Sequence, residues 1–332
     1  MRPFAYTRAT SPAEAIDAAT PEASVKYLAG GTNLVDLMRE GIERPERVVD
    51  VTRLPLDAIE ELVGGGLRIG ATARNSHVAH DRRVRERYPM LARAILNGAS
   101  PQLRNMATVG GNLVQRTRCP YFYDLAAACN KREPGAGCDA LDGYNRTHAI
   151  LGTSASCIAV HPSDMCVALA ALDAVVHVEG AGGARRAIPI VDFHRLPGQT
   201  PHIETALESG ELITAIDLPP APAGRSTYLK VRDRASFAFA LVSVGALLGV
   251  EEGRIASARV ALGGVAHKPW RARAAEDLLI GAPADEATFR RAAERALEGA
   301  RPRRHNAFKV ELAKRLIFRT LADLVAGAGD GA

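Results

Sequence analysis

Four of the five cysteines in this chain lie close together, in a stretch that lacks a periodic pattern of apolar residues. They are Cys119, Cys129, Cys138 and Cys157, and periodicity is absent from 116 to 152. A long segment without secondary structure inside a compact domain needs its own organiser. Because a chain of 332 residues buries enough surface to fold without disulfides, the crowding predicts a binding site inside an insertion at about 116–157.

Cysteine spacing limits the kind of site. The spacings are C-x9-C, C-x8-C and C-x18-C, whereas structural zinc sites usually carry C-x2-C to C-x4-C pairs. Thiolate sulfur favours an iron–sulfur cluster or zinc, and a disulfide would need an oxidising compartment, for which the first ten residues give no signal peptide. The residues alone rank a cluster above zinc, and zinc above free thiols. His148 and His161 are possible ligands, but a surface or hydrogen-bonded role fits each better.

The fifth cysteine has a different setting. Cys166 lies in a helix that Pro162-Ser163-Asp164 opens, next to Met165 and Val167. We therefore expect it to be a small buried core residue.

Composition excludes several classes of function. The chain is 47% hydrophobic and 24% charged, which is typical of a globular protein, and only 5% aromatic, which leaves few stacking platforms for nucleic acid. A net charge of +5 suits an anionic cofactor better than a nucleic acid. The longest apolar stretch, 237–250, is too short for a membrane helix and is expected to be a buried strand. We expect a chain without membrane or nucleic-acid partners, located in the cytoplasm unless a partner exports it.

Apolar spacing and turn residues predict alternating helices and strands. A Pro-rich stretch at 219–224 is the predicted domain boundary. The first 55 residues form a small α/β unit, 56–222 a second one, and 225–330 a C-terminal domain. Helices are expected at 12–19, 34–40, between 75 and 97, at 164–172 and at 308–325; strands are expected at 25–29, 48–51, 67–71, 175–178, 187–190, 212–218, 227–231, 237–250 and 255–262.

Two glycine-rich turns carry the binding chemistry. Gly30-Gly31-Thr32-Asn33 stands between a strand and a helix, and Thr108-Val-Gly-Gly-Asn112 repeats its small, hydroxyl and amide residues. Glycines let a backbone approach an anion, and a helix N-terminus adds partial positive charge. Neither G-x-G-x-x-G nor a P-loop occurs. Each turn alone could be structural, but two of them predict a ligand with two phosphates.

These motifs, taken in order, resemble a known family. Leu28-Ala-Gly-Gly-Thr-Asn-Leu34, Ala107-Thr-Val-Gly-Gly-Asn-Leu113, Pro162-Ser-Asp164 and Tyr228-Leu-Lys-Val-Arg232 are similar to motifs of the FAD-binding (medium) subunit of the xanthine dehydrogenase and aldehyde oxidoreductase family of molybdenum hydroxylases. The insertion resembles the branch of bacterial periplasmic aldehyde oxidoreductases, whose FAD subunits carry an extra [4Fe-4S] cluster. The resemblance implies that Cys119, Cys129, Cys138 and Cys157 are the cluster ligands.

The resemblance also implies a fold and a set of flavin contacts. The fold is α+β: a PCMH-type, vanillyl-alcohol-oxidase-like FAD domain of two subdomains, followed by a small α+β domain like the C-terminal domain of CO dehydrogenase flavoproteins. Asp164 would bind ribose or ribityl hydroxyls, and Lys230 would lie near the pyrimidine edge of the flavin, where a cation stabilises the reduced ring. A helix N-terminal charge and a solvated lysine are the ordinary interpretations of these two residues. The flavin-binding residues implied are Leu28, Ala29, Gly30, Gly31, Thr32, Asn33, Leu34, Thr108, Gly111, Asn112, Asp164, Ile213 and Lys230.

The implied function is electron transfer. A large partner with a molybdenum cofactor would oxidise an aldehyde or a heterocycle, a small [2Fe-2S] partner would relay the electrons, and this chain would pass them through FAD to an external acceptor. The three chains would form a heterotrimer or a dimer of heterotrimers, either cytoplasmic or exported to the periplasm on a partner's twin-arginine signal. A self-sufficient FAD oxidase or dehydrogenase and a zinc-stabilised nucleotide-binding module are the alternatives.

Overall fold

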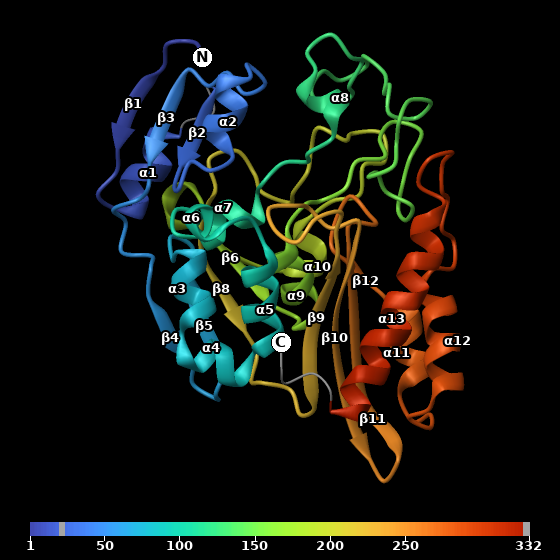
Figure 1. Ribbon diagram of the computed structural model, residues 1–332. Helices are drawn as coiled ribbons and strands as arrows, with labels where there is room; N and C mark the ends of the chain where they lie inside the picture. The colour runs from blue at the N-terminus through green and yellow to red at the C-terminus, as the bar shows by residue number, and fades with distance from the viewer. Residues whose placement is uncertain (20–23, 328–332) are drawn as a thin grey trace.

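Three small sheets with their helices make up the computed structural model, which describes residues 1–19 and 24–327 (Figure 1). The last three residues of the predicted C-terminal domain, 328–330, lie outside the described residues. No helix in the described ranges is long and apolar enough to cross a membrane.

The N-terminal unit is a three-stranded parallel sheet in the order β1-β3-β2. Ser11 caps α1 by accepting from the amide of Glu14, as its sequence predicts. The sequence expectation missed β1, because four residues with a mostly exposed pattern give no apolar signal. The unit comprises β1 (Ala5–Arg8), α1 (Pro12–Ala18), β2 (Val25–Leu28), α2 (Leu34–Arg39) and β3 (Arg47–Asp50).

The second unit is built on a five-stranded antiparallel sheet in the order β4-β5-β8-β6-β7. Strand β8 is the last of the five in the sequence but lies in the middle of the sheet. The sheet is therefore complete only after the chain has passed through the insertion and formed β6 and β7. The unit comprises β4 (Ile59–Glu61), β5 (Leu67–Gly70), α3 (Asn75–His80), α4 (Arg82–Arg87), α5 (Pro89–Asn97), α6 (Pro101–Arg104), α7 (Val109–Leu113), α8 (Pro120–Tyr123), α9 (Asp164–Ala171), β6 (Val175–Glu179), η1 (Ala181–Gly183), β7 (Arg185–Pro189), α10 (Ile190–Phe193) and β8 (Leu212–Leu218).

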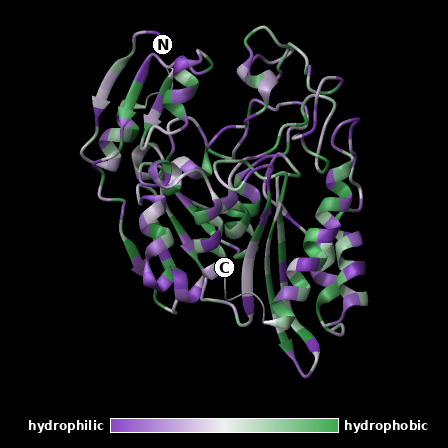
Figure 2. Ribbon diagram, in the orientation of Figure 1, coloured by the Kyte–Doolittle hydropathy of each residue, from purple (hydrophilic) through white to green (hydrophobic). Residues whose placement is uncertain are grey.

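The C-terminal unit is a four-stranded antiparallel sheet in the order β12-β11-β10-β9, covered by helices. Figure 2 shows hydrophobic and hydrophilic residues on the same helices here, as expected when one face enters a core. The unit comprises β9 (Arg225–Val231), β10 (Val242–Glu251), β11 (Arg254–Gly263), β12 (Trp270–Arg271), α11 (Arg273–Leu279), α12 (Glu286–Ala296) and α13 (Phe308–Ala326).

Helix α9 joins the second and C-terminal units. Every residue of it is buried, and it packs on α5 from one side and on β10 and β11 from the other. Gly245 of β10 and Gly263 of β11 permit this contact, since a Cβ at either position would lie against Val167 of α9. Cys166 is fully buried in this helix, which confirms the expected core position.

The strand expected from residue 237 is wrong at its start. Strand β10 begins at Val242, and Phe237 has a left-handed φ of 49°. The side chains of Phe237 and Phe239 are about half exposed. Apolar composition suggested burial in a sheet, whereas these aromatic residues form a loop beside a large cavity.

The insertion contains one short helix, α8, and otherwise turns (Figure 1, upper part). Hydrogen bonds from side chains to backbone carbonyls, rather than helices or strands, hold most of this segment in place. The Arg132 guanidinium donates to the carbonyls of Tyr121, Phe122 and Asp124, and Lys309 of α13 donates through Nζ to the carbonyls of Thr147, His148 and Gly264.

Candidate cofactor site

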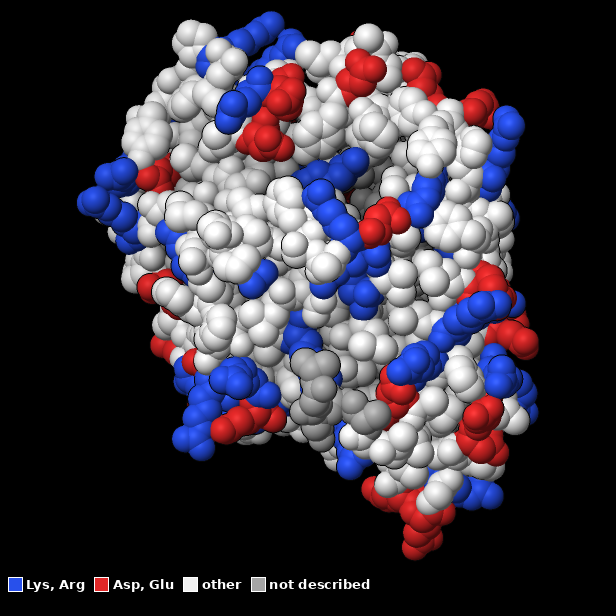
Figure 3. Space-filling model, in the orientation of Figure 1, with Lys and Arg blue, Asp and Glu red and all other residues white. Residues whose placement is uncertain are grey.

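One large cavity, with a volume of about 1330 Å³, opens between the three units and the insertion. Its volume exceeds the range of about 300–1,000 Å³ typical of small-molecule sites. Figure 3 shows this face hollowed beside Lys and Arg side chains. The lining carries both signs of charge. Its arginines, which could contact an anionic group, are Arg39, Arg104, Arg116, Arg118 and Arg234, and its carboxylates are Asp36, Glu43, Asp164, Glu204, Glu208, Glu211 and Asp233.

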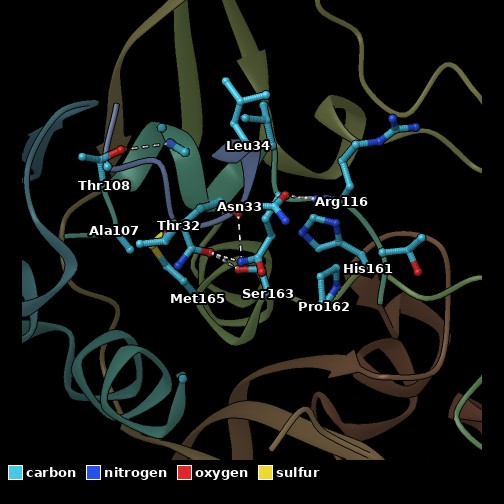
Figure 4. A pocket seen from close by; sticks show the side chains of 18 of the residues that line it. Thr32, Asn33, Leu34, Ala107, Thr108, Arg116, His161, Pro162, Ser163 and Met165 are labelled. Atoms are coloured by element: carbon cyan, nitrogen blue, oxygen red, sulfur yellow. Dashed lines mark hydrogen bonds between the residues drawn. The ribbon is translucent and has the colours of Figure 1, made fainter. Parts of the chain in front are cut away.

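The first glycine turn forms one wall. Gly31 has a φ of 72°, a left-handed conformation that favours glycine. A Cβ on Gly30 would lie 1.9 Å from the carbonyl oxygen of Met106, so the two glycine-rich turns touch through backbone. Thr32 and Asn33 lie near Ser163, Arg116 and His161 in this wall (Figure 4).

The second turn is fastened by its own polar side chains. The Thr108 hydroxyl accepts from the amide of Gly111 and caps α7, at 3.2 Å. Asn112 Oδ1 accepts from Ser163 Oγ at 2.5 Å and from Gln115 Nε2 at 2.8 Å. The Asn112–Ser163 bond places the end of α7 beside the start of α9, with both on the cavity wall.

Asp164 and Lys230 form a buried pair beside the cavity. Lys230 Nζ donates to Asp164 Oδ2 at 2.7 Å and to the carbonyl of Asn97 at 3.0 Å, while the Tyr228 hydroxyl donates to Asp164 Oδ1. Asp164 lines the cavity, but Lys230 does not and its side chain is 1% exposed. Lys230 therefore neutralises Asp164 from behind the wall.

Every predicted flavin-binding residue except Leu28 and Lys230 lines this one cavity. Four polar atoms of residues in this wall are buried without a hydrogen-bond partner: Asn33 Nδ2, Thr72 Oγ1, Asn75 Oδ1 and Ser243 Oγ. Since buried polar groups are normally paired, these atoms fit a large ligand with many polar groups, such as a dinucleotide.

Sequence reasoning missed Thr72, Asn75 and Ser243. Thr72 lies two residues after strand β5, and Asn75 is the first residue of α3, so polar residues between a buried strand and a helix were the available signal. Ser243 gave no signal, because it stands inside an apolar strand.

The four clustered cysteines converge in the insertion. The backbones of Cys129 and Cys138 form an isolated antiparallel β-bridge. His148 Nε2 lies 3.1 Å from Cys119 Sγ. We expected His148 to be either a surface residue or a hydrogen-bonded one. It is buried, and it is hydrogen-bonded to Cys119. No disulfide joins any of the five cysteines, all of which lie within the described ranges.

The surroundings of these sulfurs suit bound thiolates. Burial, together with the neighbouring cysteine sulfurs, raises the pKa of Cys119 to about 12 and that of Cys157 to about 11. Backbone amides oppose this: those of Phe122 and Tyr121 favour ionised Cys119, and the amide of Ala159 donates to Cys157 Sγ at 3.4 Å. Thiols that are hard to ionise alone, yet surrounded by N–H donors, fit a cationic inorganic centre.

Comparisons with known proteins agree on a family. Residues 2–221 match the family model of the FAD binding domain in molybdopterin dehydrogenase, and residues 227–324 match that of the CO dehydrogenase flavoprotein C-terminal domain. The chain is an FAD-binding subunit of the molybdenum hydroxylase family.

Individual relatives cover nearly all of this FAD subunit. It is 53% identical to the aldehyde oxidoreductase FAD-binding subunit PaoB of Escherichia coli K12, over 99% of this chain and 100% of that protein. It is 26% identical to the carbon monoxide dehydrogenase medium chain of Afipia carboxidovorans, over 85% and 82% of the two chains. A crystal structure of quinoline 2-oxidoreductase from Pseudomonas putida 86 superimposes with a TM-score of 0.76 at 26% identity, covering 98% of both chains.

These relatives confirm the predicted fold and class. The FAD subunit has the two family domains, with mixed helix and sheet, and it is part of an oxidoreductase of the aldehyde oxidoreductase and xanthine dehydrogenase type. The individual flavin contacts, the domain boundary at 219–224 and the four cysteine ligands stay predictions.

Proposed function

We propose that this FAD subunit is the electron-transfer component of a molybdenum-dependent aldehyde oxidoreductase and that it holds both FAD and a [4Fe-4S] cluster. The observation that carries the proposal is the 53% identity, over almost the whole of both chains, to an aldehyde oxidoreductase FAD-binding subunit. The cavity supports it, because two glycine-rich turns and several unpaired polar atoms face one large space.

FAD would lie in that cavity, with its pyrophosphate on the backbone of Ala29–Leu34 and of Thr108–Asn112. When bound, FAD can take two electrons one at a time and deliver them to an acceptor, which matches one-electron partners to two-electron acceptors. The chain's own residues shape the space: Asp164 presents a carboxylate whose charge Lys230 balances, and Ile213 of β8 provides an apolar surface on the wall.

The [4Fe-4S] cluster would be bound by Cys119, Cys129, Cys138 and Cys157. Cys119 and His148 line the large cavity as well as the insertion, so the cysteine site and the flavin site adjoin each other. This adjacency permits electron exchange between the two and also permits a purely structural role.

The proposed partners are a large subunit with a molybdenum cofactor and a small [2Fe-2S] subunit, arranged as a heterotrimer or as a dimer of heterotrimers. Hydroxylation would take place on the large subunit, and electrons would leave from this chain to an external acceptor. We propose assembly in the cytoplasm, with export of the folded complex if a partner carries a twin-arginine signal. Co-purification, cell fractionation and an acceptor screen test these statements.

Cofactor content tests the core of the proposal. The purified chain should contain FAD, together with iron and acid-labile sulfide at about four each per chain. Complete lack of FAD after reconstitution would overturn the flavin assignment, and zinc in place of the iron would overturn the cluster.

Changing one proposed ligand tests the cysteine assignment. Cys129→Ser should remove the iron and loosen the insertion, while FAD stays bound, because Cys129 does not line the cavity. Iron, sulfide and flavin measured on the same sample give the result. An unchanged iron content would contradict the ligand set.

A further inference from the structure

Three histidines, of which His194 and His267 are buried and His161 is half-buried, surround a second, much smaller cavity, and each has a ring nitrogen without a partner. The nitrogens are His161 Nε2, His194 Nδ1 and His267 Nε2. All three residues line a space of about 20 Å³, between the large cavity and the core. A space of this size holds one water, and three unmet nitrogens on one small cavity indicate a polar occupant.

Hydrogen bonds fix the state of two of these rings. His194 Nε2 lies 2.8 Å from the carbonyl oxygen of Leu113, and His267 Nδ1 lies 2.9 Å from that of Arg195. Because a carbonyl only accepts, both of these nitrogens carry hydrogen. His194 Nδ1 and His267 Nε2 therefore carry no hydrogen and each has a free lone pair. The occupant of the cavity must be a cation or a hydrogen-bond donor.

A sulfur completes a set of metal-binding atoms. One ligand atom from each of His161, Cys166 and His194 lies within 4.8 Å of the other two, and the two imidazole centroids are 4.2 Å apart. The three come from different segments: the residue before the Pro162-Ser163-Asp164 motif, the first turn of α9, and the residue after α10. Two imidazoles and one thiolate are a ligand set that zinc prefers.

We propose that His161, Cys166 and His194 bind a zinc ion, with a water in the small cavity as the fourth ligand. That water would donate to His267 Nε2, which satisfies the third unpartnered nitrogen. His194 would act as metal-binding histidines usually do, with its other ring N–H fixed by a backbone carbonyl. The site shares no residue with the four-cysteine set.

Zinc binding would need free lone pairs on the rings and a thiolate. Hydrogen bonds to backbone carbonyls already leave one ring nitrogen of His194 and one of His267 without hydrogen. Cys166 would release its thiol proton when it binds the metal. The site would then carry a net charge of one, beside the ion pair of Lys131 and Glu204, two residues that also line the small cavity.

Bound zinc would join three segments that form the wall of the large cavity. His161 lines both cavities, so it provides the route by which an ion and its water enter. The metal would fix the start of α9 relative to α10. A water alone, hydrogen-bonded to the three imidazoles, is the competing occupant.

Metal analysis of the complex purified with its natural partners tests the site. We expect about one zinc per chain beyond the iron, as for a structural site, and a loss of at least about tenfold in zinc occupancy in both Cys166→Ala and His194→Ala. His77→Ala, which removes an exposed histidine on α3, should leave the zinc unchanged. Iron and flavin are measured on the same samples, so a failed cluster or flavin proposal is recognised separately.

Two results would overturn the proposal. The first is a zinc content below about a tenth per chain, even after incubation with zinc, which leaves a buried water as the occupant. The second is full zinc occupancy in Cys166→Ala, which places the ion elsewhere. Cobalt(II) substitution of the iron-loaded chain gives a further readout, since a thiolate-to-cobalt absorption band should appear and should be lost in Cys166→Ala. If Cys166→Ala fails to fold, His267→Ala, which leaves all three ligands in place, should keep the zinc but bind it about 10–100-fold more weakly.

Discussion

At the scale of single residues, the ion pair with Lys230 stabilises the negative charge of Asp164 in the cavity wall. Both side chains are almost fully buried, and removing one partner of a buried ion pair costs about 3–5 kcal/mol because the other charge is left without compensation. Lys230→Met should therefore lower the free energy of unfolding by this amount, as measured by urea denaturation of the FAD-free chain. The double variant Asp164→Leu/Lys230→Met should lose less, and an equal loss would contradict the pairing argument.

Gly30 is the residue where the two glycine-rich turns touch. Alanine there would push its Cβ into the Met106 carbonyl, so the turns must separate and the pyrophosphate site must open. We expect Gly30→Ala to weaken FAD binding by at least about tenfold, or ~1.4 kcal/mol, measured by flavin fluorescence titration. Gly180→Ala is the matched control, since Gly180 has a φ of −123°, does not line the cavity, and would bring its Cβ no closer than 3.5 Å to a neighbour, Glu211 Cγ. Equal FAD affinity in the two variants would show that the turns do not form the site.

At the scale of elements, ion pairs hold the insertion to the rest of the chain. Glu204 accepts from Lys131 Nζ at 2.6 Å and from Arg116 Nε at 2.5 Å, and Arg116 also pairs with Glu43 of the N-terminal unit. Burial alone would raise the pKa of Glu204, but Lys131 and Arg116 lower it to about 2. These contacts bind 116–157 in place of a sheet or a helix bundle.

This pKa predicts how stability depends on pH. The ordinary value for glutamate is 4.5 and the folded value is about 2, so the stabilising contribution is complete above pH 4.5 and is lost as the pH falls toward 2. Glu204→Gln should cost about 2–3 kcal/mol at pH 7 and should unfold with a weaker acid dependence below pH 4.5. Thermal unfolding at several pH values measures both, and an unchanged acid dependence would exclude Glu204 as its source.

Most regular elements could be predicted from sequence, and the exceptions have physical causes. Strand β8 and helices α1 and α9 follow from apolar runs and from Ser caps. Strand β10 starts later than expected because hydrophobicity alone does not distinguish buried Val242 from exposed Phe237. The cysteine set stood out by its crowding. Sequence analysis named His161 only as a possible ligand beside those cysteines, and it could not place His161 with His194 and His267, since the three meet only in the folded chain.

At the scale of the whole molecule, α9 and the C-terminal sheet share one close interface. A Cβ on Gly245 would lie 3.0 Å from Met90 Sδ and 3.6 Å from Val167, and a larger side chain there forces the units apart. Gly245→Val should cost about 1–3 kcal/mol through overpacking, measured by chemical denaturation. Combined with Met90→Ala, the loss should fall short of the sum by at least about 0.5 kcal/mol. Strictly additive losses would mean that the two residues are not in contact.

Lys309 and Asn306, close to the end of the chain, bind the carbonyls of 147–149 in the insertion. These carbonyls have no such partners while the last helix is still inside the ribosome. The cysteine-bearing segment can therefore reach its final shape only after residues 306 and 309 have left the ribosome. The order of events follows from this: the insertion forms late in folding, and a chain truncated before 306 should accumulate with an unformed insertion.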